Sequence, residues 1–193
     1  MIHPHTELRL VDERIGHGVF ATRFIPRGTL TWVLCQLDQI YTPEQVETLP
    51  APYRRIMDTY AYINADGTWV LCWDWGRYMN HSCAPNTLGL GAYADVAVRD
   101  IQPGEQITCE YGMLNLTEGM PCHCGAPGCR GRVEGDDVLR CGEAWDAVVA
   151  QTAPLVALVA QPLRGFMQDP VFLDELAAGR AAPPKARSYF HAS

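Results

Sequence analysis

The chain has 193 residues, of which 48% are hydrophobic and 19% charged, a composition typical of a folded globular protein rather than a disordered one. Its 17 glycines and 14 prolines favour many short strands joined by turns over a helical bundle. The formal net charge of −7, without a run of Lys and Arg, argues against direct nucleic-acid binding and is better matched to a basic polypeptide partner.

The hydropathy pattern predicts no membrane association. The N-terminal residues lack the basic start and apolar core of a signal peptide. The longest apolar stretch, residues 147–160, is interrupted by Gln151 and Pro154 and is too short to span a bilayer. We expect a reducing, cytoplasmic environment, with a bacterial origin suggested by residue usage and a nuclear or secreted location left open. In such an environment a tight cysteine cluster predicts a metal site rather than disulfides.

The first third of the chain predicts short β-strands and short helices. Residues 8–11, 19–22 and 30–33 have the residue types and alternation of strands. Gly16-His17-Gly18 is expected to form a flexible corner between the first two. Residues 43–58 are expected to hold one or two short helices, because Pro43 suits a first helical turn and later prolines interrupt the segment.

The middle of the chain predicts a hairpin and two similar corners. Residues 60–64 and 68–72 flank Ala65-Asp66-Gly67, a hairpin turn signal. The pattern Ala21-x-Arg23-x-Ile25-x-x-Gly28 recurs as Ala97-x-Arg99-x-Ile101-x-x-Gly104. We interpret these segments as two strand-turn-strand corners rather than as a true repeat.

The last third predicts helices. From Glu143 onward one helical face is expected to carry Trp145, Val148, Val149, Leu155, Leu158 and Val159, with Pro154 starting or kinking its second half. Residues 172–178 predict a second short helix that ends at Gly179. Residues 181–193 are expected to be extended or partly disordered.

A loop with three closely spaced thiols predicts a zinc site. Cys122, Cys124 and Cys129 lie within eight residues on a Gly- and Pro-containing segment that has little capacity to form a core. A closed tetrahedral site needs a fourth ligand. From spacing alone, His123 and Cys141 are candidates, as is a cysteine elsewhere in the chain.

Several segments together resemble the SET-domain family. Ile15 to Ala21, followed by Ile25-Pro26-Arg27-Gly28, is similar to its N-terminal Gly-x-Gly corner. Residues 77–86, Arg-Tyr-Met-Asn-His-Ser-Cys-Ala-Pro-Asn, resemble its most specific signature, and residues 101–112 resemble its last strand and exit. The cysteine loop, residues 122–131, resembles the post-SET zinc module.

The resemblance implies a mainly β fold with short helices, in which small curved sheets surround a threaded C-terminal segment. It implies a SET domain over residues 6–114 and a post-SET zinc segment over residues 118–133. Residues 134–193 fall outside the resemblance and are expected to form a helical extension with a flexible tail. That extension is expected either to complete the substrate groove or to form a dimer contact, so monomer and homodimer both stay open.

The resemblance also implies a protein-lysine N-methyltransferase that uses S-adenosylmethionine as its methyl donor. The donor-binding residues it implies are Gly16, His17, Gly18, Tyr60, Arg77, Tyr78, Asn80, His81 and Tyr111. Tyr111 is the implied catalytic residue, because methyl transfer needs alignment of donor and amine more than a strong acid or base. Tyr62 and Cys109 are expected in the substrate channel. Cys109 stands where relatives often have an aromatic residue, so di- or trimethylation is expected.

The same resemblance implies that Cys83 completes the zinc tetrahedron with Cys122, Cys124 and Cys129. Four thiolates leave no open coordination position, so the single zinc ion is expected to be structural. The implied partner is a basic protein or peptide that carries the target lysine. Two alternatives remain: a catalytically weak SET-fold module that binds basic peptides, and a methyltransferase that acts on a non-protein amine.

Overall fold

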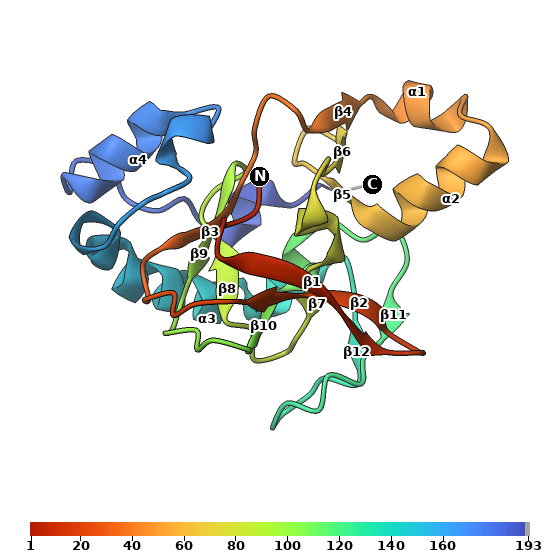
Figure 1. Ribbon diagram of the computed structural model, residues 1–193. Helices are drawn as coiled ribbons and strands as arrows, with labels where there is room; N and C mark the ends of the chain where they lie inside the picture. The colour runs from red at the N-terminus through yellow and green to blue at the C-terminus, as the bar shows by residue number, and fades with distance from the viewer. Residues whose placement is uncertain (192–193) are drawn as a thin grey trace.

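The computed structural model describes residues 1–191, and these form several small sheets with helices at the two ends of the molecule (Figure 1). The first sheet has the order β1 (Thr6–Asp12), β2 (Gly16–Ala21), β10 (Gln106–Cys109) and β7 (Asn80–His81). A second sheet contains β3 (Leu30–Val33), β9 (Ala94–Ala97) and β8 (Thr87–Gly89). A third contains β4 (Gln39–Tyr41), β6 (Trp69–Leu71) and β5 (Ala61–Ile63), and β11 (Met120–Pro121) pairs with β12 (Arg132–Val133).

The predicted strands are confirmed, but the predicted corner is misplaced. The turn between β1 and β2 consists of residues 13–15, and Gly16, His17 and Gly18 belong to β2. Pairing with Leu10, Arg9 and Asp12 extends the hairpin through these residues, so backbone hydrogen bonding overrides their conformational freedom. The predicted hairpin between β5 and β6 is confirmed, with Ala61 opposite Leu71 and Gly67 at a φ of 81° in the turn.

The two corners with matching sequence patterns pack against each other with reciprocal hydrogen bonds. The amide of Gly28 donates to the carbonyl of Ala97 at 2.9 Å, and the amide of Gly104 donates to the carbonyl of Ala21 at 2.7 Å. Ile25 and Ile101 pair as an antiparallel bridge, and both are fully buried. The sequence pattern therefore marks a local two-fold relation that joins the first sheet to the second.

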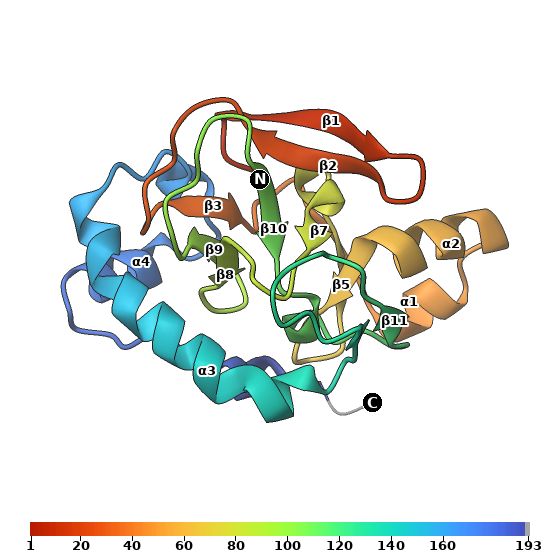
Figure 2. The same ribbon diagram turned by 90° about the horizontal axis from the view of Figure 1, so that it is seen from below.

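Within residues 1–191, four α-helices flank the sheets. Helices α1 (Pro43–Glu47) and α2 (Ala51–Tyr60) lie at one end of the molecule, and α4 (Pro170–Ala177) lies at the other (Figure 1). Helix α3 (Asp137–Thr152) runs along one side (Figure 2). Short 3-10 turns form η1 (Trp75–Tyr78), η2 (Tyr111–Met113), η3 (Ala153–Leu158), η4 (Arg164–Phe166) and η5 (Ala186–Tyr189).

The C-terminal helices share a hydrophobic core with the second sheet. Trp145, Val149 and Val156 are buried in one cluster with residues of β3, β8 and β9. The expected helical face is wrong at Leu158, which is 76% exposed, because the 3-10 winding after Pro154 turns Val156 inward instead. The residues after α3 are therefore an integral part of the fold.

The segment expected to be an extended tail packs against the body of the protein. Ala186, in η5, is buried in the same cluster as α3, and its amide donates to Asp146 Oδ1 at 2.8 Å. Asn115 Nδ2 donates to the carbonyl of Tyr189 at 2.7 Å and to that of Ile63 at 2.9 Å. The buried side-chain amide of Asn115 therefore joins the C-terminal segment to β5. Sequence spacing gives no indication of either of its partners. The expectation for residues 192 and 193 lies outside the described residues.

Candidate functional site

Three adjacent strands bring the glycine segment and the Asn-His pair together. Strand β10 pairs with β2 on one side and in parallel with β7 on the other, where Thr108 lies opposite Asn80. Asn80 Nδ2 donates to the carbonyl of His17 at 3.0 Å. A Cβ atom at Gly18 would lie 2.9 Å from Asn80 Nδ2 and still closer to the side chain of Gln106. Glycine is therefore required at position 18 so that the neighbouring side chains can lie close to the backbone, and it would allow a ligand the same close approach.

Tyr111 is fixed at both its ends. Its hydroxyl donates to the carbonyl of Met79 at 2.8 Å, and its backbone amide donates to His81 Nδ1 at 3.2 Å. Burial raises the pKa of Tyr111 well above its ordinary value, so the hydroxyl keeps its proton. The Tyr111 side chain is thus held in one position, with an uncharged hydroxyl group, beside the strand that bears Asn80 and His81.

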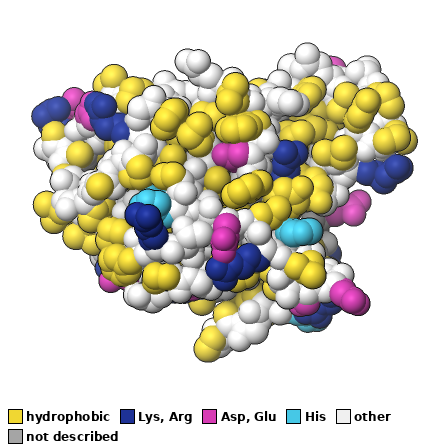
Figure 3. Space-filling view, viewed as in Figure 1, with side chains coloured by type: hydrophobic (Ala, Val, Ile, Leu, Met, Phe, Trp, Pro, Cys, Tyr) yellow, Lys and Arg dark blue, Asp and Glu magenta, His cyan; other side chains and the backbone are white. Residues whose placement is uncertain are grey.

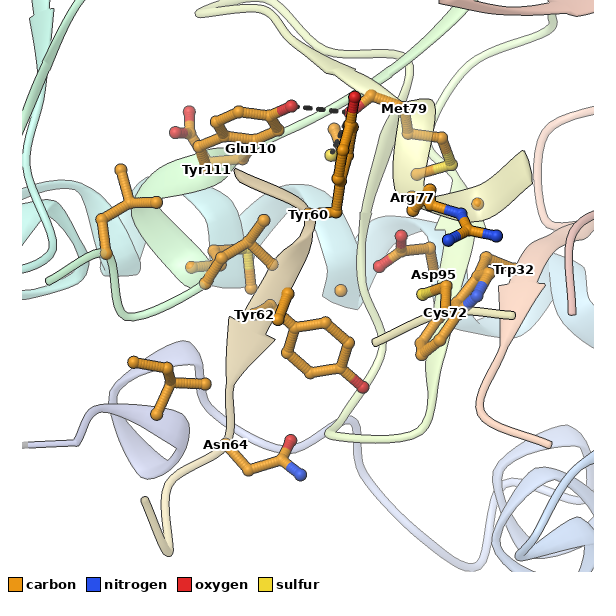
Figure 4. A pocket seen from close by; sticks show the side chains of 18 of the residues that line it. Trp32, Tyr60, Tyr62, Asn64, Cys72, Arg77, Met79, Asp95, Glu110 and Tyr111 are labelled. Atoms are coloured by element: carbon orange, nitrogen blue, oxygen red, sulfur yellow. Dashed lines mark hydrogen bonds between the residues drawn. The ribbon is translucent and has the colours of Figure 1, made fainter. Parts of the chain in front are cut away.

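A hollow of about 280 Å³ opens next to Tyr111 (Figure 4). Tyr60, Tyr62, Arg77, Cys109 and Tyr111 all line it. The other predicted donor residues lie outside this lining: Gly16, His17 and Gly18 are on β2, Asn80 and His81 are on β7, and Tyr78 ends η1.

Tyr78 joins the two groups. Its ring centroid lies 5.3 Å from that of Tyr60 and 6.2 Å from that of His17, in edge-to-face arrangements. The structure therefore brings the predicted donor and channel residues into one region and divides them between the hollow, the neighbouring strands and η1.

The predicted zinc ligands lie around Cys122. Its Sγ atom is 3.8 Å from Cys83 Sγ and 3.6 Å from Cys129 Sγ. The ligand atoms of Cys83, Cys122, Cys124 and His81 all lie within 4.8 Å of one another. Cys83 thus joins the loop cysteines across 39 residues of sequence, as the resemblance implied. His81, which was expected only at the donor, stands in this group where Cys129 was predicted, and Cys129 approaches the group through Cys122.

A buried ion pair that the sequence did not predict joins this loop to the Tyr111 segment. Arg130 Nη1 lies 2.9 Å from Glu110 Oε2, and Nη2 lies 2.6 Å from Oε1. The Glu110 side chain is fully buried, and Oε1 also accepts the amide of Gly112 at 2.8 Å. The Arg130 guanidinium lies over the ring of Trp145, 5.9 Å from its centroid. The sequence gives only one indication of this ion pair, which is position: Glu110 directly precedes Tyr111, and Arg130 directly follows Cys129.

The chain matches the SET domain family over residues 16–112 and therefore belongs to that family. It is 31% identical to the histone-lysine N-methyltransferase ash1 of Drosophila melanogaster over 138 residues, which cover 62% of this chain and 6% of that protein. It is 29% identical to the histone-lysine N-methyltransferase Set2 of the same organism over 150 residues, covering 69% of this chain and 6% of that protein. The chain thus spans only a small part of these relatives.

One solved structure, from a candidate histone methyltransferase of Plasmodium falciparum, aligns with a TM-score of 0.42 at 20% identity, covering 57% of this chain and 95% of that one. A similarity this low supports no functional conclusion. Among residues 1–191, no helix is long and apolar enough to cross a membrane.

Proposed function

We propose that this chain is a protein-lysine N-methyltransferase that uses S-adenosylmethionine. The observation that carries the proposal is the anchored Tyr111 hydroxyl, held 2.8 Å from the Met79 carbonyl at the edge of the hollow. Asn80 and His81 follow Met79 directly, and Asn80 contacts the glycine strand through the His17 carbonyl. Main-chain and side-chain polar groups suited to a donor therefore adjoin an aromatic-lined hollow suited to an alkyl amine.

The chain's residues contribute alignment and a low-polarity environment. When bound, S-adenosylmethionine supplies the methyl group. The Tyr111 hydroxyl presents its oxygen lone pairs to the transfer position, where they accept weak C–H···O contacts and orient the amine. The amine must be neutral to react, and a free lysine has a pKa of about 10.4. Desolvation between the rings of Tyr60, Tyr62 and Tyr111 disfavours the charged ammonium form.

A donor-binding titration followed by a methylation assay on peptide arrays tests this proposal. Donor binding together with transfer to lysine-containing peptides supports it. Peptide binding without transfer favours the alternative of a catalytically weak binding module. Transfer to a small free amine in preference to any peptide favours the non-protein substrate.

The cysteine cluster fits a structural zinc ion. With Zn–S bonds of about 2.3 Å, the sulfur atoms of a tetrahedron lie about 3.8 Å apart. The separations of Cys122 Sγ from Cys83 Sγ and Cys129 Sγ are 3.8 and 3.6 Å. We assign Cys83, Cys122, Cys124 and Cys129 as the residues that would hold the metal.

His81 is better suited to support this cluster than to replace a ligand. Its Nδ1 accepts the Tyr111 amide, so in the neutral ring the proton is on Nε2. Nε2 lies 3.3 Å from Cys83 Sγ and points its N–H at a thiolate, which stabilises that ligand. His81 would thereby couple the zinc cluster to the position of Tyr111.

Cys109 supports the formation of multiply methylated products. It is buried beside the hollow, with its Sγ 4.0 Å from the carbonyl of Met79. A thiol is smaller than the aromatic ring often found at this position, so it leaves room for added methyl groups. We therefore propose di- or trimethylation, which mass spectrometry of the product distinguishes from a monomethyl product.

A basic protein or peptide remains the proposed partner. On the face shown in Figure 3, Lys and Arg side chains are scattered among acidic and hydrophobic ones rather than gathered into one patch. With a net charge of −7, the surface favours encounter with a basic segment. Histone lysines are the targets that the names of the two relatives specify, and they make a reasonable first substrate panel.

A further inference from the structure

One part of the hollow has a chemistry that methyl transfer does not require. Trp32 and Asp95 lie opposite each other in the β3–β9 pair, and both line the hollow. A register shift between Leu30 and Trp32 makes an irregularity in β3, the kind of feature that re-aims a side chain. Tyr62 from β5 and Cys72, the residue after β6, line the same part of the hollow, on the side away from the Tyr111–Met79 hydrogen bond (Figure 4). We call these four residues, Trp32, Tyr62, Cys72 and Asp95, the acidic chamber.

The polar groups of the acidic chamber have no partners among residues 1–191. Trp32 Nε1 and Tyr62 OH are buried without a hydrogen bond. Asp95 is a half-buried residue that lines the hollow, and its carboxylate takes part in none of the hydrogen bonds or ion pairs formed by the described residues. The neighbouring Asp38 and Asp74 differ, because each accepts two backbone N–H groups. Buried groups without a partner, here Trp32 Nε1 and Tyr62 OH, are unusual and point to a ligand. The Tyr62 hydroxyl oxygen and the Asp95 carboxylate offer acceptors to such a ligand, whereas Trp32 Nε1 is a donor only.

The charge and the rings of the acidic chamber favour a cation. Burial raises the pKa of the side chains of Tyr62, Cys72 and Cys109, so these three groups stay neutral beside Asp95. Arg77, a cation that lines the same hollow, donates to the carbonyl of Trp73 and forms no ion pair with Asp95 among the described residues. The rings of Trp32 and Tyr62 meet at 88° with centroids 5.8 Å apart, and ring faces attract alkylammonium ions.

We propose that the acidic chamber is a binding subsite for an alkylammonium group, held by the Asp95 carboxylate and by the rings of Trp32 and Tyr62. Such a group is an amine in its protonated or methylated form. The identification of this cation as the target lysine side chain after one or more methyl transfers rests on the proposed function. The subsite itself does not rest on it. Between successive transfers it would hold the charged amine in the same hollow that Cys109 and Tyr111 line.

Choline and its neutral carbon isostere, 3,3-dimethyl-1-butanol, test the subsite without donor or methyl transfer. Affinities come from ligand-observed saturation-transfer NMR, and the indole N–H signal of Trp32 in labelled protein reports the location. At about pH 8, where the Asp95 carboxyl group is ionised, we expect choline to bind about tenfold more tightly than the isostere. Asp95→Asn should weaken choline binding about tenfold and leave the isostere unchanged.

Asp58→Asn is the matched control, because Asp58 is an exposed carboxylate that lines the same hollow. It should change choline affinity by less than about twofold, since exposed charges are screened by solvent. Thermal melting of both variants checks that each is folded. Where Asp95→Asn fails to fold, Trp32→Phe replaces it, with an expected loss of about threefold because Trp gives the stronger cation–π attraction.

A peptide with trimethyl-lysine distinguishes the two sources of the cation. Displacement of choline by this peptide, but not by the unmodified one, identifies the substrate side chain as the source; absence of displacement identifies a free amine. Equal binding of choline and the isostere, or equal effects of Asp95→Asn and Asp58→Asn, would overturn the subsite. Methyl transfer measured on the same wild-type preparation reports separately on the proposed function.

Discussion

Replacing Arg130 with alanine should destabilise the protein far more than replacing Arg132, two residues away. Arg130 forms a two-point ion pair with Glu110, whose side chain is fully buried, while the Arg130 side chain is 22% exposed. Removing one partner of a buried pair leaves an uncompensated charge and costs about 3–5 kcal/mol. Arg132 pairs with Glu134, but these side chains are 54% and 37% exposed, so its loss should cost less than about 1 kcal/mol.

These free energies translate into separable melting temperatures. For a protein of this size, 1 kcal/mol shifts the melting temperature by about 2–4 °C. Arg130→Ala should therefore melt about 6–20 °C lower than the wild type, and Arg132→Ala less than about 4 °C lower. Circular dichroism of zinc-saturated protein at neutral pH gives both values.

A double variant separates the ion pair from general damage to the loop. Arg130→Met combined with Glu110→Gln removes both charges of this pair, while Asp137, the other carboxylate near Arg130, keeps its ion pair with Arg140. The double variant should therefore recover a large part of the loss caused by Arg130→Ala. Arg130 follows Cys129 directly, so Arg130→Ala should also release zinc faster to a chromophoric chelator. Equal, small melting shifts for Arg130→Ala and Arg132→Ala would refute the role assigned to the buried pair.

Four further predictions follow from the site. Tyr111→Phe should lose most methyl transfer while keeping donor affinity, as single-turnover assays and calorimetry would show; normal turnover contradicts the assignment. Cys122→Ser should lose the single zinc ion that elemental analysis finds in Cys141→Ser, and equal zinc contents would be inconsistent with the ligand set. Cys109→Phe should shift the product towards monomethyl-lysine in mass spectra, whereas an unchanged product ratio would count against the size argument. Burial raises the pKa of Asp95 from its ordinary value near 4 to about 7, so the folded protein loses stability as the pH rises towards 7 and this carboxyl group ionises. Asp95→Asn should therefore melt at a higher temperature than the wild type at about pH 8 but not at about pH 4. The same difference in melting temperature at both pH values would exclude this titration.

Local patterns were sufficient to predict much of the fold. Alternation and turn residues located β3 and the β5–β6 hairpin, and Gly179, at a φ of 69°, follows the end of α4 as expected. The matching corners at Ile25 and Ile101 were also visible, although their mutual packing was not. These features depend on neighbours in sequence, which a pattern can represent.

The expectations that the structure contradicts concern segments whose conformation is decided by tertiary packing. Leu158 satisfied a helical period, but the 3-10 turn after Pro154 exposes it. The C-terminal segment contains prolines and no long apolar run, yet Asn115 binds its backbone and α3 covers Ala186. No local signal links Asn115 to a carbonyl 74 residues away.

The candidate site shows the same division. The signature around Asn80 placed His81, Cys83 and Tyr111 together, because a family resemblance carries long-range information. The Glu110–Arg130 pair was not predicted, since an isolated acid and an isolated base give no indication that they meet. Asp95 was likewise missed, because its importance lies in having no partner, and only the surrounding structure reveals that.

The most direct test of the central claim is mass spectrometry of methyl-lysines after the purified protein and S-adenosylmethionine are added to a lysate of the organism from which the sequence comes. New di- or trimethyl-lysine is expected on a basic protein segment with the wild type and none with Tyr111→Phe. Methylation that is equal with both proteins, or confined to small amines, would contradict it.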